Sequence, residues 1–179
     1  MFFTNLKMAL LIFHLLVSSS TASAQYCSAD ISSHTKTMCP TGWASYNNAS
    51  CYLYVATTLS HSEAEAHCQS YSKPGAPVHL ASIGSKEENT FIRDANPLPM
   101  VAFDSQWIGY VQDQQTGQFV WTDGSRGKYD NWFIRQPSQG PEEHCISMFS
   151  LSGTWNDDDC DKAFKFICKM HLRVSHLHI

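Results

Sequence analysis

The sequence lacks several features that would place it in a common class of protein. Its most apolar stretch, residues 8–17, is about half as long as the roughly 20 residues that a membrane-spanning helix needs. No C-x-x-C, H-E-x-x-H or G-x-S-x-G pattern occurs, so the signatures of a structural zinc site, a zinc protease and a serine hydrolase are missing. Positive charge is also scarce, since 12 Lys and Arg stand against 16 Asp and Glu. We therefore expect no membrane span, no nucleic-acid partner and no enzymatic activity.

The start of the chain carries the pattern of a secretory signal. Residues 1–24 combine an early lysine, the apolar stretch and a small-residue end, A-S-A at 22–24, which suits cleavage. The remaining length suits a single domain. We expect a secreted, extracellular protein, and Asn48, which begins an N-A-S sequon, is a candidate glycosylation site.

The cysteines agree with an extracellular location. All seven follow the expected signal, and thiols usually pair into disulfides outside the cell. An odd number leaves at least one cysteine without a partner in the chain, and spacing alone does not determine the pairing.

Two segments in the first half have the pattern of helices. Residues 62–71 begin with Ser62 and Glu65 at the spacing of a capping box, after which apolar side chains recur at helical intervals. Residues 85–96 begin with a second Ser-x-x-Glu pair. After residue 99, short apolar segments separated by glycines predict strands and loops. This order predicts an α+β fold.

The longest segment without clear periodicity covers residues 126–155. So long a loop in a compact domain is usually functional. It contains or adjoins residues that could anchor it to a core, namely Trp132, Cys145, Trp155 and Cys160. We therefore expect a functional loop that displays polar groups.

Oxygen-bearing side chains form three clusters in and after this loop. They are Gln136 and Ser138 around a proline, Glu142 with Glu143, and Asn156 with Asp157. Calcium binds about 6–8 oxygens in irregular geometry and accepts ligands from separate loops. The alternative is a solvated acidic loop. The order of the features, with an acid before one cysteine and Trp-Asn-Asp before another, favours calcium.

Several motifs together resemble the C-type lectin-like domain family. They are C-P-T-G-W at 39–43 with C-Y at 51–52, S-E-A-E-A-H-C-Q-S at 62–70, H-L-A-S-I at 79–83, W-I-G at 107–109, W-N-D at 155–157 and F-I-C-K at 166–169. The resemblance covers nearly all of residues 39–169 and implies the long form of the family. It implies two helices packed on small antiparallel sheets, disulfides, and a long calcium-binding loop. Residues 25–38 are then an N-terminal extension and residues 170–179 a C-terminal tail.

The resemblance also implies a disulfide pattern. The implied pairs are Cys39 with Cys51, Cys68 with Cys168, and Cys145 with Cys160. Cys27 is left over. We expect Cys27 either to be free or to link two chains into a dimer.

In sugar-binding members of this family, one calcium ion is held by oxygens that also hydrogen-bond the sugar. The matching positions, implied as both metal ligands and carbohydrate-binding residues, are Gln136, Ser138, Glu143, Asn156 and Asp157. The Gln-Pro-Ser triplet is more similar to the galactose-type Gln-Pro-Asp than to the mannose-type Glu-Pro-Asn. Ser138 replaces an Asn or Asp of the family, and a lower ligand charge weakens calcium binding.

The resemblance implies a calcium-dependent lectin for galactose-type glycans, such as glycans on microbial surfaces in innate immunity. Ser138 keeps an alternative open, in which the same fold binds a protein or another non-sugar ligand without calcium. A second calcium site of some family members is not expected, because the matching positions hold Gln112, Thr116, Gln139 and His144.

The remaining aromatic and charged residues are assigned to the core or the surface. The tryptophans are expected in the core, whereas Phe133 and Phe149 are candidate sugar contacts. Asp158 and Asp159 are expected to be solvated or paired at the surface. His171, His176 and His178 could bind a transition metal, but without partner acids they are expected to lie in a disordered or weakly packed tail.

Overall fold

The structure is a computed structural model that describes residues 39–172. The expected signal at 1–24, the extension at 25–38 with Cys27, and residues 173–179 lie outside the described residues. Among the residues that are described, no helix is long and apolar enough to cross a membrane.

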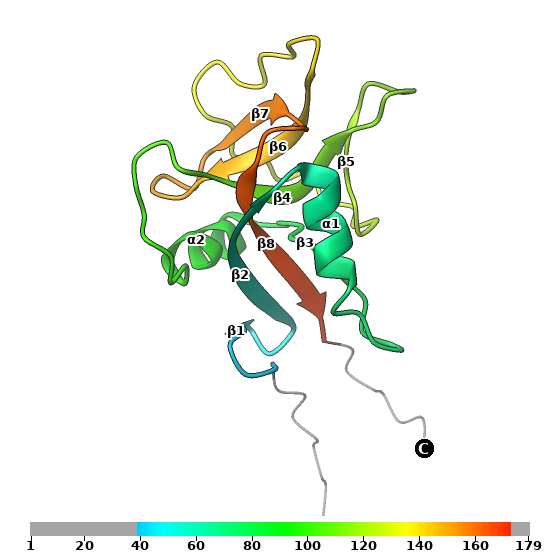
Figure 1. Cartoon of the computed structure of the whole chain (residues 1–179), viewed down its shortest axis with the longest axis vertical. Helices are drawn as coiled ribbons and strands as arrows, with labels where there is room; N and C mark the ends of the chain where they lie inside the picture. The colour runs from blue at the N-terminus through cyan, green and yellow to red at the C-terminus, as the bar shows by residue number, and fades with distance from the viewer. Residues whose placement is uncertain (1–38, 173–179) are drawn as a thin grey trace, which may run out of the picture. The chain divides into compact units, whose positions relative to one another are not determined.

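Within residues 39–172 the chain forms two helices and eight strands (Figure 1). In chain order they are β1 (Ala44–Tyr46), β2 (Ser50–Leu59), α1 (His61–Gln69), β3 (Val78–Leu80), α2 (Lys86–Asp94), β4 (Ser105–Gln112), β5 (Phe119–Trp121), β6 (Glu143–Phe149), β7 (Trp155–Asp159) and β8 (Phe164–His171). The strands follow the order β1-β2-β8-β4-β6-β7, with β3 paired to β8 and β5 paired to β4.

One parallel contact holds the sheet together. Strands β4 and β8 run parallel where Gln106 faces Lys165 and Trp107 faces Phe166, and the other named strand pairs are antiparallel. The predicted α+β class is confirmed. The strands differ from the expected separate antiparallel sheets, because this contact joins β1-β2-β8 to β4-β6-β7 in one mixed sheet.

The N-cap of helix α1 lies two residues earlier than the sequence predicted. Ser60 is its N-cap, and the backbone N–H and hydroxyl of Ser60 both donate to Glu63 Oε2, at 3.0 Å and 2.7 Å. The expected capping pair of Ser62 with Glu65 is therefore wrong. Glu65 instead faces the sheet and accepts a hydrogen bond from the Leu80 N–H at 2.8 Å. The side chain that we assigned to the cap therefore makes a tertiary contact.

Helix α2 has the expected cap, with the Glu88 N–H donating to the Ser85 hydroxyl at 3.1 Å. The Glu88 carboxylate, however, points inward. It accepts the Gly84 N–H at 2.7 Å, the Lys169 ammonium at 2.8 Å and the Tyr52 hydroxyl. The buried pair of Glu88 and Lys169 therefore ties α2 to β8, the central strand.

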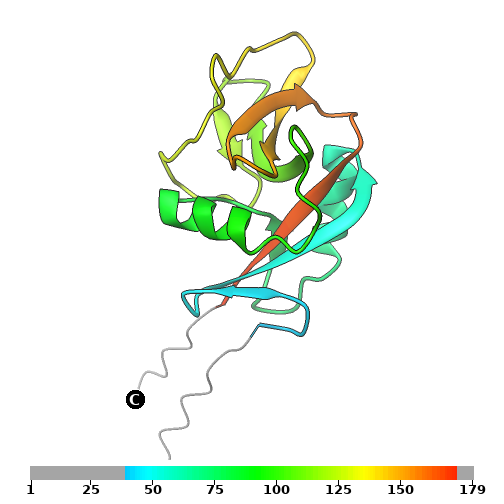
Figure 2. The ribbon, with the colours of Figure 1, turned by 90° about the vertical axis from the view of Figure 1, so that its left-hand side faces the viewer.

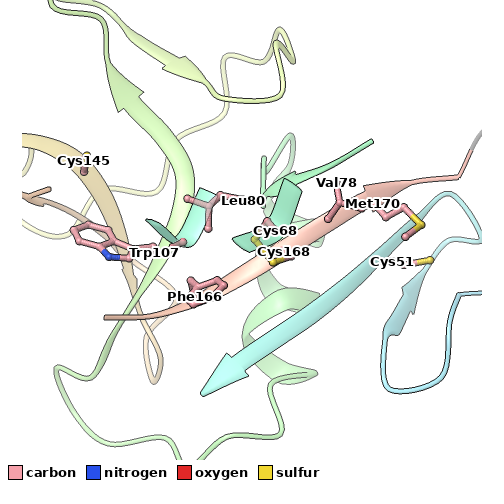
Figure 3. Packing of buried hydrophobic residues seen from close by; sticks show 10 residues of the cluster. Cys51, Cys68, Val78, Leu80, Trp107, Cys145, Phe166, Cys168 and Met170 are labelled. Carbon is pink, nitrogen blue, oxygen red and sulfur yellow. A yellow bond between two sulfur atoms is a disulfide. The ribbon is translucent and has the colours of Figure 1, made fainter. Parts of the chain in front are cut away.

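The two helices cover opposite sides of β2 and β8 (Figures 1 and 2). On the α1 side the buried cluster includes Leu80, Trp107 and Phe166 around the Cys68–Cys168 disulfide (Figure 3). A second buried cluster includes Ile92, Ile108, Met148 and Trp155. The predicted core position is confirmed for Trp107, Trp121 and Trp155, while Trp43 and Trp132 are half-buried.

Three disulfides link distant parts of the domain, and they are the pairs that the family resemblance implies. Cys39–Cys51 holds the β1–β2 hairpin, Cys68–Cys168 joins α1 to β8, and Cys145–Cys160 joins β6 to the turn after β7. Each such bond typically stabilises a domain by about 2–4 kcal/mol, mainly by restricting the unfolded chain.

Strand β8 continues past the expected domain boundary at residue 169. Met170 is buried and pairs with Cys51, and His171 pairs with Ser50. The prediction of a disordered or weakly packed tail is wrong for His171, and His176 and His178 lie outside the described residues. The His171 ring Nε2 lies 3.2 Å from Asp123 Oδ2, so a side-chain hydrogen bond and a strand pairing hold it in place.

Candidate functional site

The loop that carries the first candidate ligands lies between β5 and β6. Its middle is fixed to β7, because the Phe133 N–H donates to the Trp155 carbonyl and the Trp155 N–H donates to the Asn131 carbonyl, both at 2.8 Å. The expected loop over 126–155 is too long, since β6 and the start of β7 lie within it. The sequence did not indicate strand β6 because its buried residues are consecutive and lack the alternation that marks a half-buried strand.

The expected anchors do hold this region. Trp132 forms a parallel bridge with Trp155, and Cys145 is bonded to Cys160. The loop therefore starts and ends at fixed points and carries its polar groups between them.

The structure brings Asp157 and the Gln-Pro-Ser triplet together. The Gln136–Pro137 peptide bond is cis. Asp157 has no exposed surface, and its Oδ1 accepts the Ser138 N–H at 3.0 Å while Oδ2 accepts the Gln139 N–H at 2.6 Å. Asp157 thus holds the loop against β7 through backbone N–H groups.

A single hydroxyl group lies between the two candidate acidic ligands. Ser138 Oγ is 2.8 Å from Glu143 Oε2 and 3.3 Å from Asp157 Oδ1. A serine hydroxyl has one proton to donate, so it cannot satisfy both carboxylates at once. None of the ion pairs within residues 39–172 involves Glu143 or Asp157. Two carboxylates therefore meet here without a cationic side chain at ion-pairing distance in the described residues.

The neutral candidates differ in how fully they are satisfied. The Gln136 side-chain oxygen is buried and has no hydrogen-bond partner, although such groups are usually paired. Asn156 donates a side-chain amide hydrogen to the Asp157 carbonyl at 2.8 Å. This hydrogen bond does not use the side-chain oxygen of Asn156. Both amides can thus offer an oxygen to a cation.

These residues fit a hard cation better than a transition metal. Carboxylate, amide and hydroxyl oxygens are the ligands that calcium prefers. No three acidic, histidine or cysteine side chains gather in the described part of the chain, so the candidate site depends on neutral oxygens beside Glu143 and Asp157. If calcium binds, it would supply a positive centre for both carboxylates and open positions for ligand hydroxyls.

Backbone groups that the sequence did not indicate also belong to this site. The Gly140 N–H donates to Glu143 Oε2 at 3.0 Å, and a Cβ at Gly140 would lie 2.5 Å from the same oxygen. A side chain at residue 140 would therefore force the Glu143 carboxylate to shift. Gly140 in the sequence was a usable signal, because glycine often marks a place where a group comes close to the backbone.

The other two aspartates of the D-D-D run have different roles. Asp158 is 5 % exposed and accepts the Ser147 hydroxyl at 2.7 Å and the Lys162 ammonium at 2.8 Å. The prediction of a solvated or surface-paired Asp158 is wrong in its burial, although the pairing with a cation exists. Asp159 is half-buried and accepts the Asp161 N–H at 2.9 Å.

The positions that correspond to a second calcium site make other contacts. His144 Nδ1 lies 2.9 Å from Gln112 Oε1, and the Thr116 hydroxyl donates to Asp113 Oδ1 at 2.9 Å. The first contact connects the end of β4 to the start of β6, and the second lies within the β4–β5 turn.

Comparison with known proteins agrees with the fold described above. Residues 57–170 match the family model of the lectin C-type domain. The chain is 38% identical over 132 residues to an alpha-N-acetylgalactosamine-specific lectin of Patiria pectinifera, which covers 72% of this chain and 77% of that protein. Among solved structures, the C-type lectin CEL-I from Cucumaria echinata superposes with a TM-score of 0.68 at 28% identity and covers 74% of this chain and 97% of that one.

A second solved structure shows that the fold also occurs without a calcium requirement. A calcium-independent type II antifreeze protein superposes with a TM-score of 0.63 at 29% identity and covers 75% of this chain and 96% of that one. The matched domain, the fold and the disulfides lead to one conclusion. The chain belongs to the C-type lectin domain family.

Proposed function

We propose that this protein is a secreted, calcium-dependent lectin that binds galactose-type glycans. One calcium ion would be held by five side chains, namely Gln136, Ser138, Glu143, Asn156 and Asp157. The observation that carries the proposal is the meeting of Glu143 and Asp157 at one hydroxyl without a cationic partner in the described chain. Asp157 is fully buried and Glu143 is half-buried. A buried carboxylate is costly unless it is paired or binds a metal, and a calcium ion would supply the missing positive charge.

The same residues would orient the sugar. Calcium supplies attraction for two neighbouring hydroxyls, and the surrounding side chains supply hydrogen bonds to them. Gln136 carries an amide, which donates as well as accepts, whereas a glutamate there would only accept. The relative from Patiria pectinifera is named for N-acetylgalactosamine, which supports galactose-type over mannose-type ligands.

Calcium binding is expected to be weak. Both oxygens of Asp157 already accept backbone N–H groups, and the serine at 138 brings no charge. Ligand charge is one determinant of calcium affinity. We expect a dissociation constant on the order of 1 mM, in the range of weak extracellular sites.

Retention on immobilised galactose tests this function. The protein should be retained in calcium, released by a chelator, and displaced by free galactose at a lower concentration than by mannose. Glu143→Gln should abolish retention, while the exposed neighbour Glu142 offers the matched control Glu142→Gln, which should be retained. No calcium heat at millimolar concentration would exclude the calcium site, and stronger displacement by mannose would exclude the galactose assignment.

A second candidate function is calcium-independent binding of a protein or another non-sugar ligand. It is favoured by the three donors that the chain itself supplies to Asp157 and by the fold of the calcium-independent antifreeze protein. Binding of a partner that is equally strong in chelator would support this function instead.

Secretion and dimerisation are further parts of the proposal. Residues 1–24 would direct export, and Asn48, which is exposed in the β1–β2 turn, would accept a glycan. A disulfide between two copies of Cys27 would place two sugar sites on one molecule and raise avidity for clustered glycans such as those of microbial surfaces. A non-reducing gel that shows only monomer would exclude this dimer.

A further inference from the structure

The exposed apolar side chains are concentrated in one part of the described domain. Phe103 is 76% exposed and Ile134 is 73% exposed, far above the level expected for core-forming residues. Other exposed members from the same three segments are Met100, Val101, Phe133 and Leu151. Clustered exposed apolar groups usually mark a binding surface.

Ring contacts join these segments into one surface. Phe103 and Phe149 have ring centroids 5.9 Å apart, and Phe149 and Phe133 have centroids 5.5 Å apart, both edge to face. The Ser150 N–H also donates to the Asp104 carbonyl at 2.8 Å, which holds the loop before β4 beside the β6–β7 turn (Figures 1 and 2). We call Phe103, Phe149 and Phe133 the aromatic row.

The aromatic row continues directly into the candidate sugar site. The Gln136 N–H donates to the Phe133 carbonyl at 3.0 Å, so one turn of the backbone joins the row to the Gln-Pro-Ser triplet. The other side of Phe133 is fixed to β7 through the Trp155 carbonyl. A ligand held at Gln136 would therefore have the row as its neighbour.

The chemistry of the row selects an apolar ligand. Its rings offer no hydrogen-bond donors, and Lys165 on β8 is already paired with Asp104, which follows Phe103, at 2.8 Å. The exposed cation of these segments, Arg135, lies next to Ile134 in the sequence. The edge-to-face arrangement gives an uneven surface rather than a flat platform for one sugar ring. A flexible hydrocarbon can follow such a surface, and exposed Ile134 widens it with aliphatic area.

We propose that the aromatic row, with Ile134, is a subsite for the hydrocarbon aglycone of a galactoside, so that the preferred ligand is a glycolipid. This inference rests on the proposed function, because the sugar must be held at calcium for the aglycone to reach the row. The continuity at Gln136 favours this occupant over a second copy of the chain or a plain bilayer.

Calorimetry with two matched ligands tests the subsite. Octyl β-galactoside, kept below its micelle-forming concentration, should bind about tenfold more tightly than methyl β-galactoside in saturating calcium, which corresponds to removing about two methylene groups from water. The double variant Phe103→Ser/Ile134→Ser should bring this ratio close to one and leave methyl galactoside binding unchanged. Val120→Ser is the matched control, because Val120 is 44% exposed on β5 outside the row, and it should keep the tenfold ratio.

The remaining outcomes separate the two proposals. If methyl galactoside binds but the octyl ligand binds no more tightly, the subsite is wrong and the lectin function stands. If methyl galactoside fails to bind in calcium, the proposed lectin function is wrong, and the subsite proposal is then wrong as well. Three further outcomes would assign the row to another occupant and overturn the proposal. They are binding of the octyl ligand that persists in chelator, binding of the protein to plain phosphatidylcholine vesicles, and a dimer that dissociates in Phe103→Ser.

Discussion

Two buried carboxylates, one in each half of the domain, are satisfied in different ways. Glu88 on α2 accepts the Lys169 ammonium, the Gly84 N–H and the Tyr52 hydroxyl. Asp157 on β7 accepts only backbone N–H groups and one shared hydroxyl. The first carboxylate has its cation within the protein, and the second does not. Glu88 thus joins two parts of the fold, and Asp157 is the carboxylate that we propose binds calcium.

The largest expected effect comes from removing the internal cation. Lys169→Met leaves Glu88 buried and unpaired, which should lower the free energy of unfolding by about 3–5 kcal/mol. Urea unfolding measures this, with Lys128→Met as a control because Lys128 is exposed. The double variant Lys169→Met/Glu88→Gln should recover more than half of the loss. A loss no larger than that of the control would show that the pair is not structural.

The same pair should produce an acid-sensitive stability. Burial alone would raise the pKa of Glu88, but Lys169 and the hydrogen bonds lower it below its ordinary value. A carboxyl with a depressed folded pKa stabilises above its unfolded pKa and loses this contribution as the pH falls through the folded value. The free energy of unfolding should therefore decrease below about pH 4.3, the usual pKa of glutamate.

Variants identify the source of this pH dependence. Glu88→Gln should have a shallower decrease below pH 4 than the parent, whereas the exposed control Glu142→Gln should follow the parent. Asp123 keeps part of the decrease in both, since its pKa is also lowered: burial opposes this shift, and the hydrogen bonds from His171 and Ser82 produce it. Identical slopes for Glu88→Gln and the parent would contradict the assignment.

Local signals predicted the helices and most of the candidate ligands but not the contacts that fix them. Ser60 with Glu63 and Ser62 with Glu65 have the same spacing, so the sequence cannot choose between two capping boxes. The fold selects the Ser60–Glu63 capping box because the Glu65 carboxylate accepts a hydrogen bond from the Leu80 N–H, and Leu80 is distant in sequence. The ligand positions came from the family resemblance, which carries information that spacing alone does not.

The candidate site shows the same limit. The sequence identified side chains of the candidate site, namely those of Gln136, Ser138 and Asp157. The structure adds two backbone groups to the site, the N–H groups of Gln139 and Gly140. The N–H group of Gln139 has no residue-type signature, so its role is seen only once the loop is placed, whereas the glycine at 140 was a usable signal. The aromatic row is a further case, because exposure of an apolar side chain is a property of the fold.

A smaller effect is expected from neutralising the second carboxylate. Asp157→Asn replaces one accepting oxygen by an NH2 group, so one of the two backbone N–H groups loses its acceptor. The calcium-free unfolding free energy should fall by about 1–3 kcal/mol, because no internal cation loses its partner. The parent should gain about 1.4 kcal/mol at a calcium concentration tenfold above its dissociation constant, and the variant should gain nothing. Unfolding with and without calcium, with magnesium as the ion control, measures both. A calcium-free loss as large as that of Lys169→Met would remove the contrast between the two carboxylates.

The smallest expected effect comes from adding charge at Ser138. Ser138→Asp places a third carboxylate beside Glu143 and Asp157, so calcium affinity should rise roughly fivefold, or about 1 kcal/mol. The calcium-free protein should lose a similar amount, because like charges repel when no cation is present. Ser138→Asn lengthens the side chain without charge and separates reach from charge: a gain with Asp alone would identify charge as the limiting factor. Calorimetry in which neither variant binds calcium more tightly than the parent would mean that residue 138 does not contact the ion, and that Glu143 and Asp157 do not form a calcium site around it.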